Sequence, residues 1–241
     1  MPTVLLTGAG RGLGLEFVRQ YGTAGWDIIA CVRDPVHATE LAHYAETSSG
    51  KRIQVEKLDV ADPASIAALG TRLGARPIDV LLNVAGTMGR GSFAKQGLEM
   101  GKFGVSELDD WLETFRVNLF GPMKLAETLV QNVAASQQKK IVTLTSVLGS
   151  ISKNTIGGLY AYRISKAGVN AMMRSMSIDL GRKFGIIATP LHPGWVRTDM
   201  GGPRADIDAP ESIAGMIKVI DGLTKEKAGR FWMYDGSELP W

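Results

Sequence analysis

The sequence contains few of the residues that disulfide-rich, metal-binding and nucleic-acid-binding proteins require. Its 241 residues include one cysteine, Cys31, and three scattered histidines, at positions 37, 43 and 192. A single cysteine excludes an intrachain disulfide and fits a reducing cytoplasm, and the histidines form no metal-binding cluster. The formal net charge is only +3, and basic residues never occur in runs longer than two. We therefore expect no bound metal and no nucleic-acid partner.

Long apolar stretches are also missing. The N-terminus leads directly into a short apolar run without a basic flank, so we expect neither a signal peptide nor a transmembrane segment. Together with the single cysteine, this indicates a cytoplasmic protein without a membrane partner.

The sequence does have a regular alternation of short apolar runs and longer helical patterns. The apolar runs are nearly continuous, as is typical of parallel strands buried on both faces. Strands are predicted at 3–7, 27–32, 52–58, 80–83, 140–146, 186–192 and 230–233. Helices are predicted at 13–23, 35–46, 63–73, 106–134, 161–184 and 210–223. The predicted fold class is α/β, a Rossmann-like doubly wound parallel sheet in a single domain over residues 1–241. The Gly-rich connection 86–104 is long enough to be functional or mobile.

A glycine-rich turn follows the first predicted strand. It reads Thr7-Gly8-Ala9-Gly10-Arg11-Gly12-Leu13-Gly14. Glycines permit a sharp turn and let backbone N–H groups approach a pyrophosphate at the start of the following helix. The strict G-x-G-x-x-G spacing is absent because position 13 is leucine. The strand–turn–helix context favours a dinucleotide over an empty turn.

The end of the second predicted strand indicates which dinucleotide is bound. NAD sites usually place an acid there for the ribose 2′-hydroxyl, but this strand ends in Val32-Arg33. Arg33, and Arg11 in the glycine turn, could pair with a 2′-phosphate. Asp34 argues for NAD, although Pro35 beside it suggests that it starts the next helix. We favour NADP, with a plain surface charge as the alternative reading of Arg33.

Tyr162 and Lys166 lie four positions apart in a predicted helix and so share one face. A lysine ammonium beside a phenol favours the phenolate and lowers the tyrosine pKa, which helps general acid–base catalysis. A tyrosine and a lysine on a solvated helix face are the ordinary alternative.

Several motifs occur in an order that resembles the short-chain dehydrogenase/reductase family over essentially the whole chain. They are the glycine turn, Asn83-Val84-Ala85-Gly86, Asn118, Ser146, Tyr162-x-x-x-Lys166 and Pro193-Gly194. Two further segments resemble the C-factor/sniffer-like carbonyl reductases within that family. They are Leu191-His192-Pro193-Gly194-Trp195-Val196-Arg197-Thr198-Asp199-Met200-Gly201-Gly202 and Tyr234-Asp235-Gly236-x-x-Leu239-Pro240-Trp241.

The resemblance implies a role for each matching residue. Tyr162 would donate the proton, Lys166 would bind the nicotinamide ribose and tune the tyrosine, and Ser146 would bind the substrate oxygen. Asn118 would hold a water that links Lys166 to solvent; Pro122 independently leaves the carbonyl of residue 118 without its helical partner. The residues expected to contact the cofactor are Gly8, Arg11, Gly12, Leu13, Gly14, Arg33, Asp59, Val60, Asn83, Ala85, Gly86, Tyr162, Lys166, Pro193, Gly194, Val196 and Thr198.

Two alternatives inside the site stay open at this point. Tyr162 lies sixteen positions after Ser146, which is a longer interval than the family usually has, so Ser150 is a second candidate for the catalytic serine. Tyr160 is closer to Ser146 but falls off the face that carries Lys166. Asp59 could also be a helix cap before Pro63.

The sequence therefore predicts an NADP(H)-dependent oxidoreductase that reduces ketone or aldehyde carbonyls. Trp195 and Met200, in a loop at 195–209 expected to be a mobile flap, favour small hydrophobic carbonyl substrates. The alternatives are an NAD-dependent alcohol dehydrogenase and a dinucleotide-binding signalling protein of C-factor type with weak or vestigial catalysis. Apolar residues on more than one face of the helix at 161–184, together with the family likeness, predict a homodimer, or a homotetramer formed through the apolar C-terminal tail.

Overall fold

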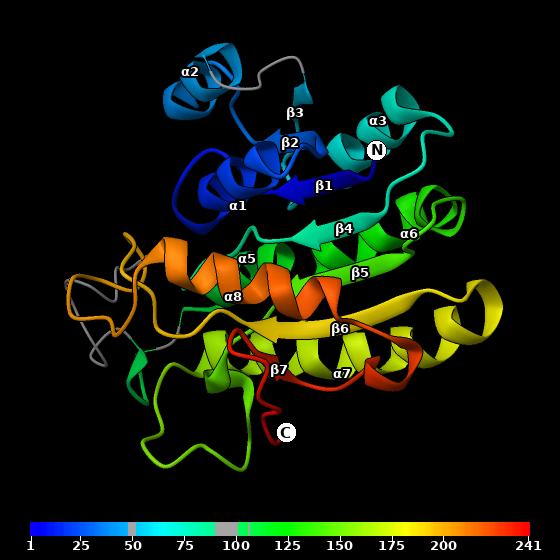
Figure 1. Cartoon of the computed structure of the whole chain (residues 1–241). Coiled ribbons are helices and arrows are strands. Elements are labelled where there is room, and N and C mark those ends of the chain that lie inside the picture. The colour runs from blue at the N-terminus through cyan, green and yellow to red at the C-terminus, as the bar shows by residue number, and fades with distance from the viewer. Residues whose placement is uncertain (48–51, 90–100, 106) are drawn as a thin grey trace.

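A seven-stranded parallel sheet runs through the centre of the protein (Figure 1). In this computed structural model, which describes residues 1–47, 52–89, 101–105 and 107–241, the strand order is β3-β2-β1-β4-β5-β6-β7. The strands are β1 (Thr3–Thr7), β2 (Asp27–Val32), β3 (Ile53–Lys57), β4 (Val80–Asn83), β5 (Lys140–Leu144), β6 (Ile187–His192) and β7 (Trp232–Met233). The order reverses between β1 and β4, where doubly wound sheets bind ligands at the carboxyl ends of their strands. The predicted fold class is confirmed.

Helices cover both faces of this sheet because its strand residues alternate between two apolar cores. Val4 and Leu6 face a core with α1 and α8, whereas Leu5 faces a core with α3, α6 and α7. The helices are α1 (Gly12–Thr23), α2 (Thr39–Thr47), α3 (Pro63–Leu73), α5 (Leu108–Phe115), α6 (Gly121–Ala134), α7 (Tyr160–Phe184) and α8 (Ala209–Asp221). Cys31 is a buried core thiol, as its apolar neighbours suggest. None of the helices that the structure describes is both long and apolar enough to cross a bilayer.

The predicted helix at 106–134 is interrupted in the part that is described, which excludes residue 106. A π-helical turn, Arg116–Phe120, joins α5 to α6, and its Gly121 N–H donates to the carbonyl of Arg116. Pro122 has no N–H to donate to the carbonyl of Asn118, so an ordinary α-helical ladder cannot pass this point. The wider turn places Asn118 inside the protein, where it is buried.

Several other predicted boundaries are wrong as well, including the end of α8 at Asp221 instead of residue 223. The helix predicted from residue 35 begins at Thr39, because Asp34 accepts the Val36 N–H at 3.1 Å and forms a turn instead of starting a helix. The strand predicted to reach residue 146 ends at Leu144, and the last strand is reduced to Trp232–Met233. Of the predicted connection 86–104, residues 90–100 lie outside the described part of the chain.

Candidate active site

Ser146, Tyr162 and Lys166 come together just beyond the carboxyl end of β5. Ser146 follows that strand by two residues and caps a 3-10 turn, with its Oγ accepting the Leu148 N–H at 3.1 Å. Tyr162 lies in the first turn of α7, and its phenol is close enough to Ser146 for that side chain to lower the pKa of Tyr162. The Lys166 Nζ, one helical turn further on, lies 5.7 Å from the centre of the Tyr162 ring. All three side chains are buried.

The electrostatics of this group follow from burial. Burial raises the pKa of Tyr162 to about 12, against a smaller lowering by the hydrogen bond with Ser146. Burial also lowers the pKa of Lys166 to about 8, and its ammonium donates to the carbonyl of Leu144 at 2.9 Å. The prediction that Lys166 brings the tyrosine pKa below its ordinary value is therefore wrong for this structure, because desolvation of the phenol dominates.

The structure distinguishes between the alternative candidates for the catalytic serine, Ser146 and Ser150, and for the catalytic tyrosine, Tyr162 and Tyr160. The Ser150 Oγ is hydrogen-bonded to the carbonyl of Pro240 at 2.7 Å, on the C-terminal tail. Tyr160 is partly exposed, and its ring meets the edge of Phe103 at 6.2 Å between centroids. Ser146 and Tyr162 are thus the pair that the fold brings together.

The carboxamide of Asn118 ties the β4 loop to helix α7. Its Oδ1 accepts the Thr87 N–H at 2.8 Å, while its Nδ2 donates to the Thr87 carbonyl at 2.8 Å and to the Ser165 Oγ at 3.0 Å. The roles of Thr87 and Ser165 could not be predicted from the sequence, because both contacts depend on how distant segments meet. The water predicted on the Asn118 carbonyl remains a prediction.

The glycine turn is packed too tightly for side chains. Gly8 and Gly12 have φ values of +70° and +52°, which favour glycine. A Cβ on Gly14 would lie 2.0 Å from the Gly8 carbonyl oxygen, and one on Gly8 would lie 3.0 Å from the Ala85 Cα. Arg11 precedes α1 without any side-chain cap, so the first N–H groups of that helix lack a side-chain acceptor. These features fit a bound pyrophosphate.

The strands beside the glycine turn add polar groups. The Thr7 Oγ1 accepts the N–H groups of Val84 and Ala85 at 3.1 and 3.0 Å, which joins the ends of β1 and β4. Thr7 stands in the predicted motif, but its bonding role was missed. The buried Asn83 Nδ2 donates to the Thr143 Oγ1 at 3.1 Å, whereas its Oδ1 has no partner in the described structure. That oxygen is a buried acceptor at the carboxyl end of β4.

At the end of β2, Arg33 supplies a positive charge, and the carboxylate of the neighbouring Asp34 is engaged with other groups. Arg33 is exposed and forms no ion pair within the described residues. Asp34 is engaged locally, since the His37 Nδ1 lies 2.6 Å from its carboxylate and holds the pKa of that carboxyl below its usual range. Arg11 lies 3.5 Å from Asp199, and both side chains are largely exposed. These charges fit a 2′-phosphate better than a free ribose hydroxyl.

The remaining predicted cofactor residues lie at the same edge of the sheet. Asp59 and Val60 follow β3; the Asp59 Oδ1 accepts the Ala61 N–H at 2.9 Å, and the cap of α3 is Asp62 instead. Pro193 and Gly194 follow β6, and Thr198 lies beside Gly12. The fold thus gathers the predicted residues of the glycine turn, β3, β4 and β6 around one edge.

The loop at 195–209, predicted as a mobile flap, has many internal bonds. The Arg197 Nε contacts Asp208 at 2.5 Å, the Trp195 Nε1 donates to the Gly201 carbonyl at 2.8 Å, and Val196 pairs with Ile207 in a β-bridge. Trp195 and Met200 nevertheless remain partly exposed, as an apolar substrate surface requires.

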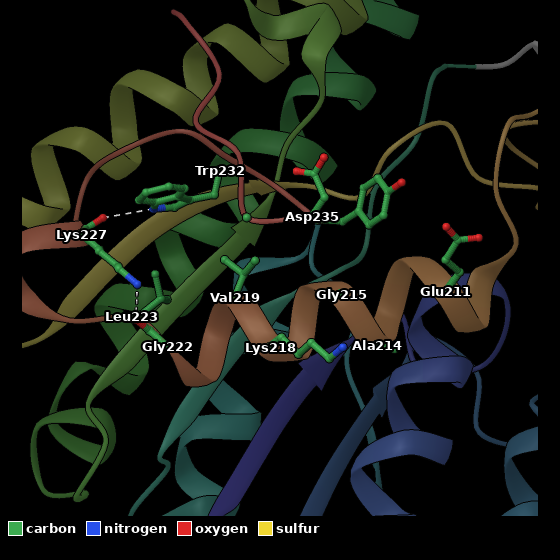
Figure 2. A pocket seen from close by; sticks show the side chains of 12 residues that line it. Glu211, Ala214, Gly215, Lys218, Val219, Gly222, Leu223, Lys227, Trp232 and Asp235 are labelled. Carbon is green, nitrogen blue, oxygen red and sulfur yellow. Dashed lines mark hydrogen bonds between the residues drawn. The ribbon is translucent and has the colours of Figure 1, made fainter.

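A surface groove of about 500 Å³ lies away from these residues, between α8 and the segment around β7. Figure 2 shows Trp232 and Lys227 at one end of it and Glu211 at the other, with Asp235 between them. None of the predicted catalytic or cofactor residues lines the groove. Across the described ranges, no three His, Cys, Asp or Glu side chains could hold a metal ion together.

Comparisons with known proteins agree with this arrangement. Residues 2–208 match the family described as short chain dehydrogenase. The chain is 42% identical over 174 residues to the C-signal of Myxococcus xanthus, covering 72% of this chain and 99% of that protein. Among solved structures it is similar to the carbonyl reductase Sniffer of D. melanogaster, with a TM-score of 0.89 and 30% identity over the full length of both chains. It is also similar to the NADPH-bound carbonyl reductase from chicken fatty liver, with a TM-score of 0.88 and 31% identity over 100% of this chain and 99% of that one.

Proposed function

The chain belongs to the short-chain dehydrogenase family, in the branch of the C-factor and sniffer-type carbonyl reductases, and from this premise we propose that it reduces ketones and aldehydes with NADPH. One observation carries the proposal. Ser146, Tyr162 and Lys166 lie together as a buried group at the carboxyl edge of the sheet, on the same edge as a glycine turn in which Gly8 and Gly14 leave no room for side chains. An NADPH-bound relative with the same fold supports the choice of cofactor.

The residues that would hold NADPH are distributed along that edge. The N–H groups at the start of α1 would bind the pyrophosphate, and Arg33 with Arg11 would bind the 2′-phosphate. Asp59, Val60 and the Asn83–Gly86 segment would meet the adenosine. The Pro193–Thr198 segment, Tyr162 and Lys166 would contact the nicotinamide riboside. The bound cofactor supplies a hydride to the carbonyl carbon of the substrate.

The protein's own part is to stabilise and protonate the substrate oxygen. Ser146 and Tyr162 would donate hydrogen bonds to that oxygen, and these bonds strengthen as negative charge develops on it. Because burial raises the pKa of Tyr162 to about 12, its phenol is protonated at neutral pH and would act as the acid that protonates the substrate oxygen. After Tyr162 gives up its proton, the Lys166 cation stabilises the phenolate. We propose that a water on the Asn118 carbonyl returns the proton from solvent.

The test is a binding titration with NADPH and NADH, followed by turnover on a panel of aromatic, cyclic and charged carbonyls. We expect activity on several hydrophobic ketones with modest discrimination, because Trp195 and Met200 expose apolar surface near the site. Turnover of one polar substrate with rejection of all others would contradict this view of the pocket. A preference for NADH with alcohol oxidation would favour the NAD-dependent alcohol dehydrogenase.

The similarity to C-signal favours a second candidate, a dinucleotide-binding signalling protein with weak or vestigial catalysis. Tight NADPH binding with no turnover on any carbonyl would support it. A protein that only binds the cofactor has no use for a buried Tyr162 beside Ser146, so we place this candidate second. For either candidate we propose a cytoplasmic location, since the single cysteine is a buried thiol.

We also propose that the protein forms a homodimer through α6 and α7. Of the apolar residues predicted on α7, Met173 and Met176 are buried in the core, whereas Ile178 is partly exposed. A groove of about 490 Å³ between α6 and α7, lined by Met123, Val130 and Met172, leaves apolar surface for a second copy. Light scattering at micromolar concentration should therefore give twice the chain mass of 25.9 kDa; the mass of a single chain would contradict the dimer.

A further inference from the structure

Arg163 is a buried arginine without an acidic partner. It stands between Tyr162 and Lys166 in sequence, and only 8% of its surface is exposed. Its Nε donates to the carbonyls of Gly157 and Gly158 at 3.3 and 3.1 Å, and its Nη1 donates to the carbonyl of Leu148 at 3.2 Å. No ion pair to Arg163 exists among the residues described. Burying a guanidinium is costly, so these three carbonyl dipoles must compensate for its lost hydration.

Two of the three carbonyls belong to a left-handed stretch that leads into α7. Gly157, Gly158 and Leu159 have φ values of +67°, +68° and +50°. Leu159 carries a side chain in a region that glycine normally occupies, so the surrounding contacts must hold it there. The Leu159 carbonyl accepts the Arg163 N–H at 2.8 Å, and the Leu159 N–H donates to Gly101 at 2.8 Å. The stretch therefore fixes where α7 begins, two residues before Tyr162.

The third carbonyl belongs to the turn that carries Ser146. The Leu148 N–H donates to the Ser146 Oγ, and the Leu148 carbonyl accepts from Arg163. The same turn packs closely on α7, since a Cβ on Gly149 would lie 2.7 Å from the carbonyl carbon of Lys166. Contacts therefore run without a break from Arg163 through the Leu148 peptide to the Ser146 hydroxyl, and the Tyr162 phenol lies near that hydroxyl.

We propose that Arg163 is a positioning residue that holds Ser146 against Tyr162 by anchoring the Ser146 turn and the 157–159 stretch to the first turn of α7. Sixteen positions separate the serine from the tyrosine, and Gly157-Gly158 would make this connection flexible without an anchor. The planar fork of a guanidinium reaches carbonyls on both sides at once, which a lysine ammonium cannot do with the same geometry. This inference rests on the proposed function, because catalysis is its main readout.

The experiment compares Arg163→Ala and Arg163→Lys with Arg182→Ala. Arg182 is an exposed arginine on the same helix, with no hydrogen bond or ion pair in the described structure, so its variant should behave as the parent. For the best ketone, kcat should fall at least about tenfold in Arg163→Ala and by a smaller factor in Arg163→Lys. The dissociation constant for NADPH should stay within about twofold, since Arg163 contacts none of the cofactor residues of the glycine turn. Added methylguanidine should restore kcat at least about threefold in Arg163→Ala and leave the parent unchanged.

A second readout needs no substrate. Lys153 lies exposed in the connection that Arg163 anchors, so trypsin should cut after it faster in Arg163→Ala than in the parent or in Arg182→Ala. A kcat equal to that of the parent in both Arg163 variants would overturn the proposal. Loss of both NADPH binding and turnover would also overturn it, because that result indicates a general role of Arg163 in folding. If the parent reduces no carbonyl, the proposed function fails, but trypsin cleavage still tests the anchoring role of Arg163. Faster cleavage of Arg163→Ala than of the parent supports that role, and an unchanged cleavage rate overturns it.

Discussion

Tyr162→Phe is expected to lower ketone turnover by at least ~10²-fold, the usual scale for losing a general acid. The substitution keeps the ring and removes only the hydroxyl, so folding and NADPH binding should survive. The loss has a direct physical reason, because the phenol near Ser146 is the proton donor in the proposed mechanism. Steady-state kinetics on the best ketone measure the effect, and a Tyr162→Phe protein as active as the parent would remove this residue from the mechanism.

Two companion variants make that result specific. Tyr160→Phe should change turnover little, since Tyr160 lies on the exposed side and contacts Phe103. Lys166→Ala should reduce both turnover and cofactor affinity. Because burial lowers the pKa of Lys166 to about 8, its cation is present below that pH and lost above it. Reduction by the parent should therefore decline as the pH rises through about 8, and Lys166→Ala should lack this step.

NADPH is expected to bind at least tenfold more tightly than NADH, equivalent to ~1.4 kcal/mol. Arg33 stands at the end of β2 without an ion-pair partner among the described residues, while Asp34 is held by His37 and the Val36 N–H. Arg33→Asp should narrow or reverse the preference, because it removes the cation and adds an acid that can accept from a ribose hydroxyl. Fluorescence titration with both cofactors measures the two constants.

The matched control for this prediction is Arg182→Asp, which makes the same charge change on the exposed end of α7 and should leave the preference intact. Since Arg33 is exposed, the preference for NADPH should also weaken at high salt. Equal affinity of the unmodified protein for both cofactors would contradict the assignment of NADP.

The inner strands were predictable because they are buried on both faces and therefore read as near-continuous apolar runs, whereas the edge strands β3 and β7 are only partly buried. The run Thr3–Thr7, for example, sends Val4 and Leu6 into one core and Leu5 into the other. The position of the glycine turn was predictable for a similarly local reason: the sharp bend and the contact of Gly14 with Gly8 both require glycine. Both features can therefore be predicted from the local sequence alone.

Features that depend on distant contacts could not be predicted. Ser146 and Ser150 differed only in their spacing to Tyr162, and the contact of Ser150 with Pro240 separates them in the structure. The π-helical turn around Asn118 arises from a combination of Pro122 and the surrounding packing. The raised pKa of Tyr162 reflects burial, which residue spacing does not report. Arg163 lies inside the Tyr162-x-x-x-Lys166 motif, yet its proposed role depends on backbone carbonyls of two other segments.

The most direct test of the central claim follows the hydride itself. The protein is incubated with a hydrophobic ketone and NADPH in which both hydrogens at C4 of the nicotinamide are replaced by deuterium, and the alcohol is analysed by mass spectrometry and NMR. We predict one deuterium on the carbinol carbon of the product, with formation of the labelled alcohol reduced at least ~10²-fold in Tyr162→Phe. Alcohol without deuterium at that carbon, or no alcohol from any ketone despite tight NADPH binding, would contradict the assignment as a carbonyl reductase.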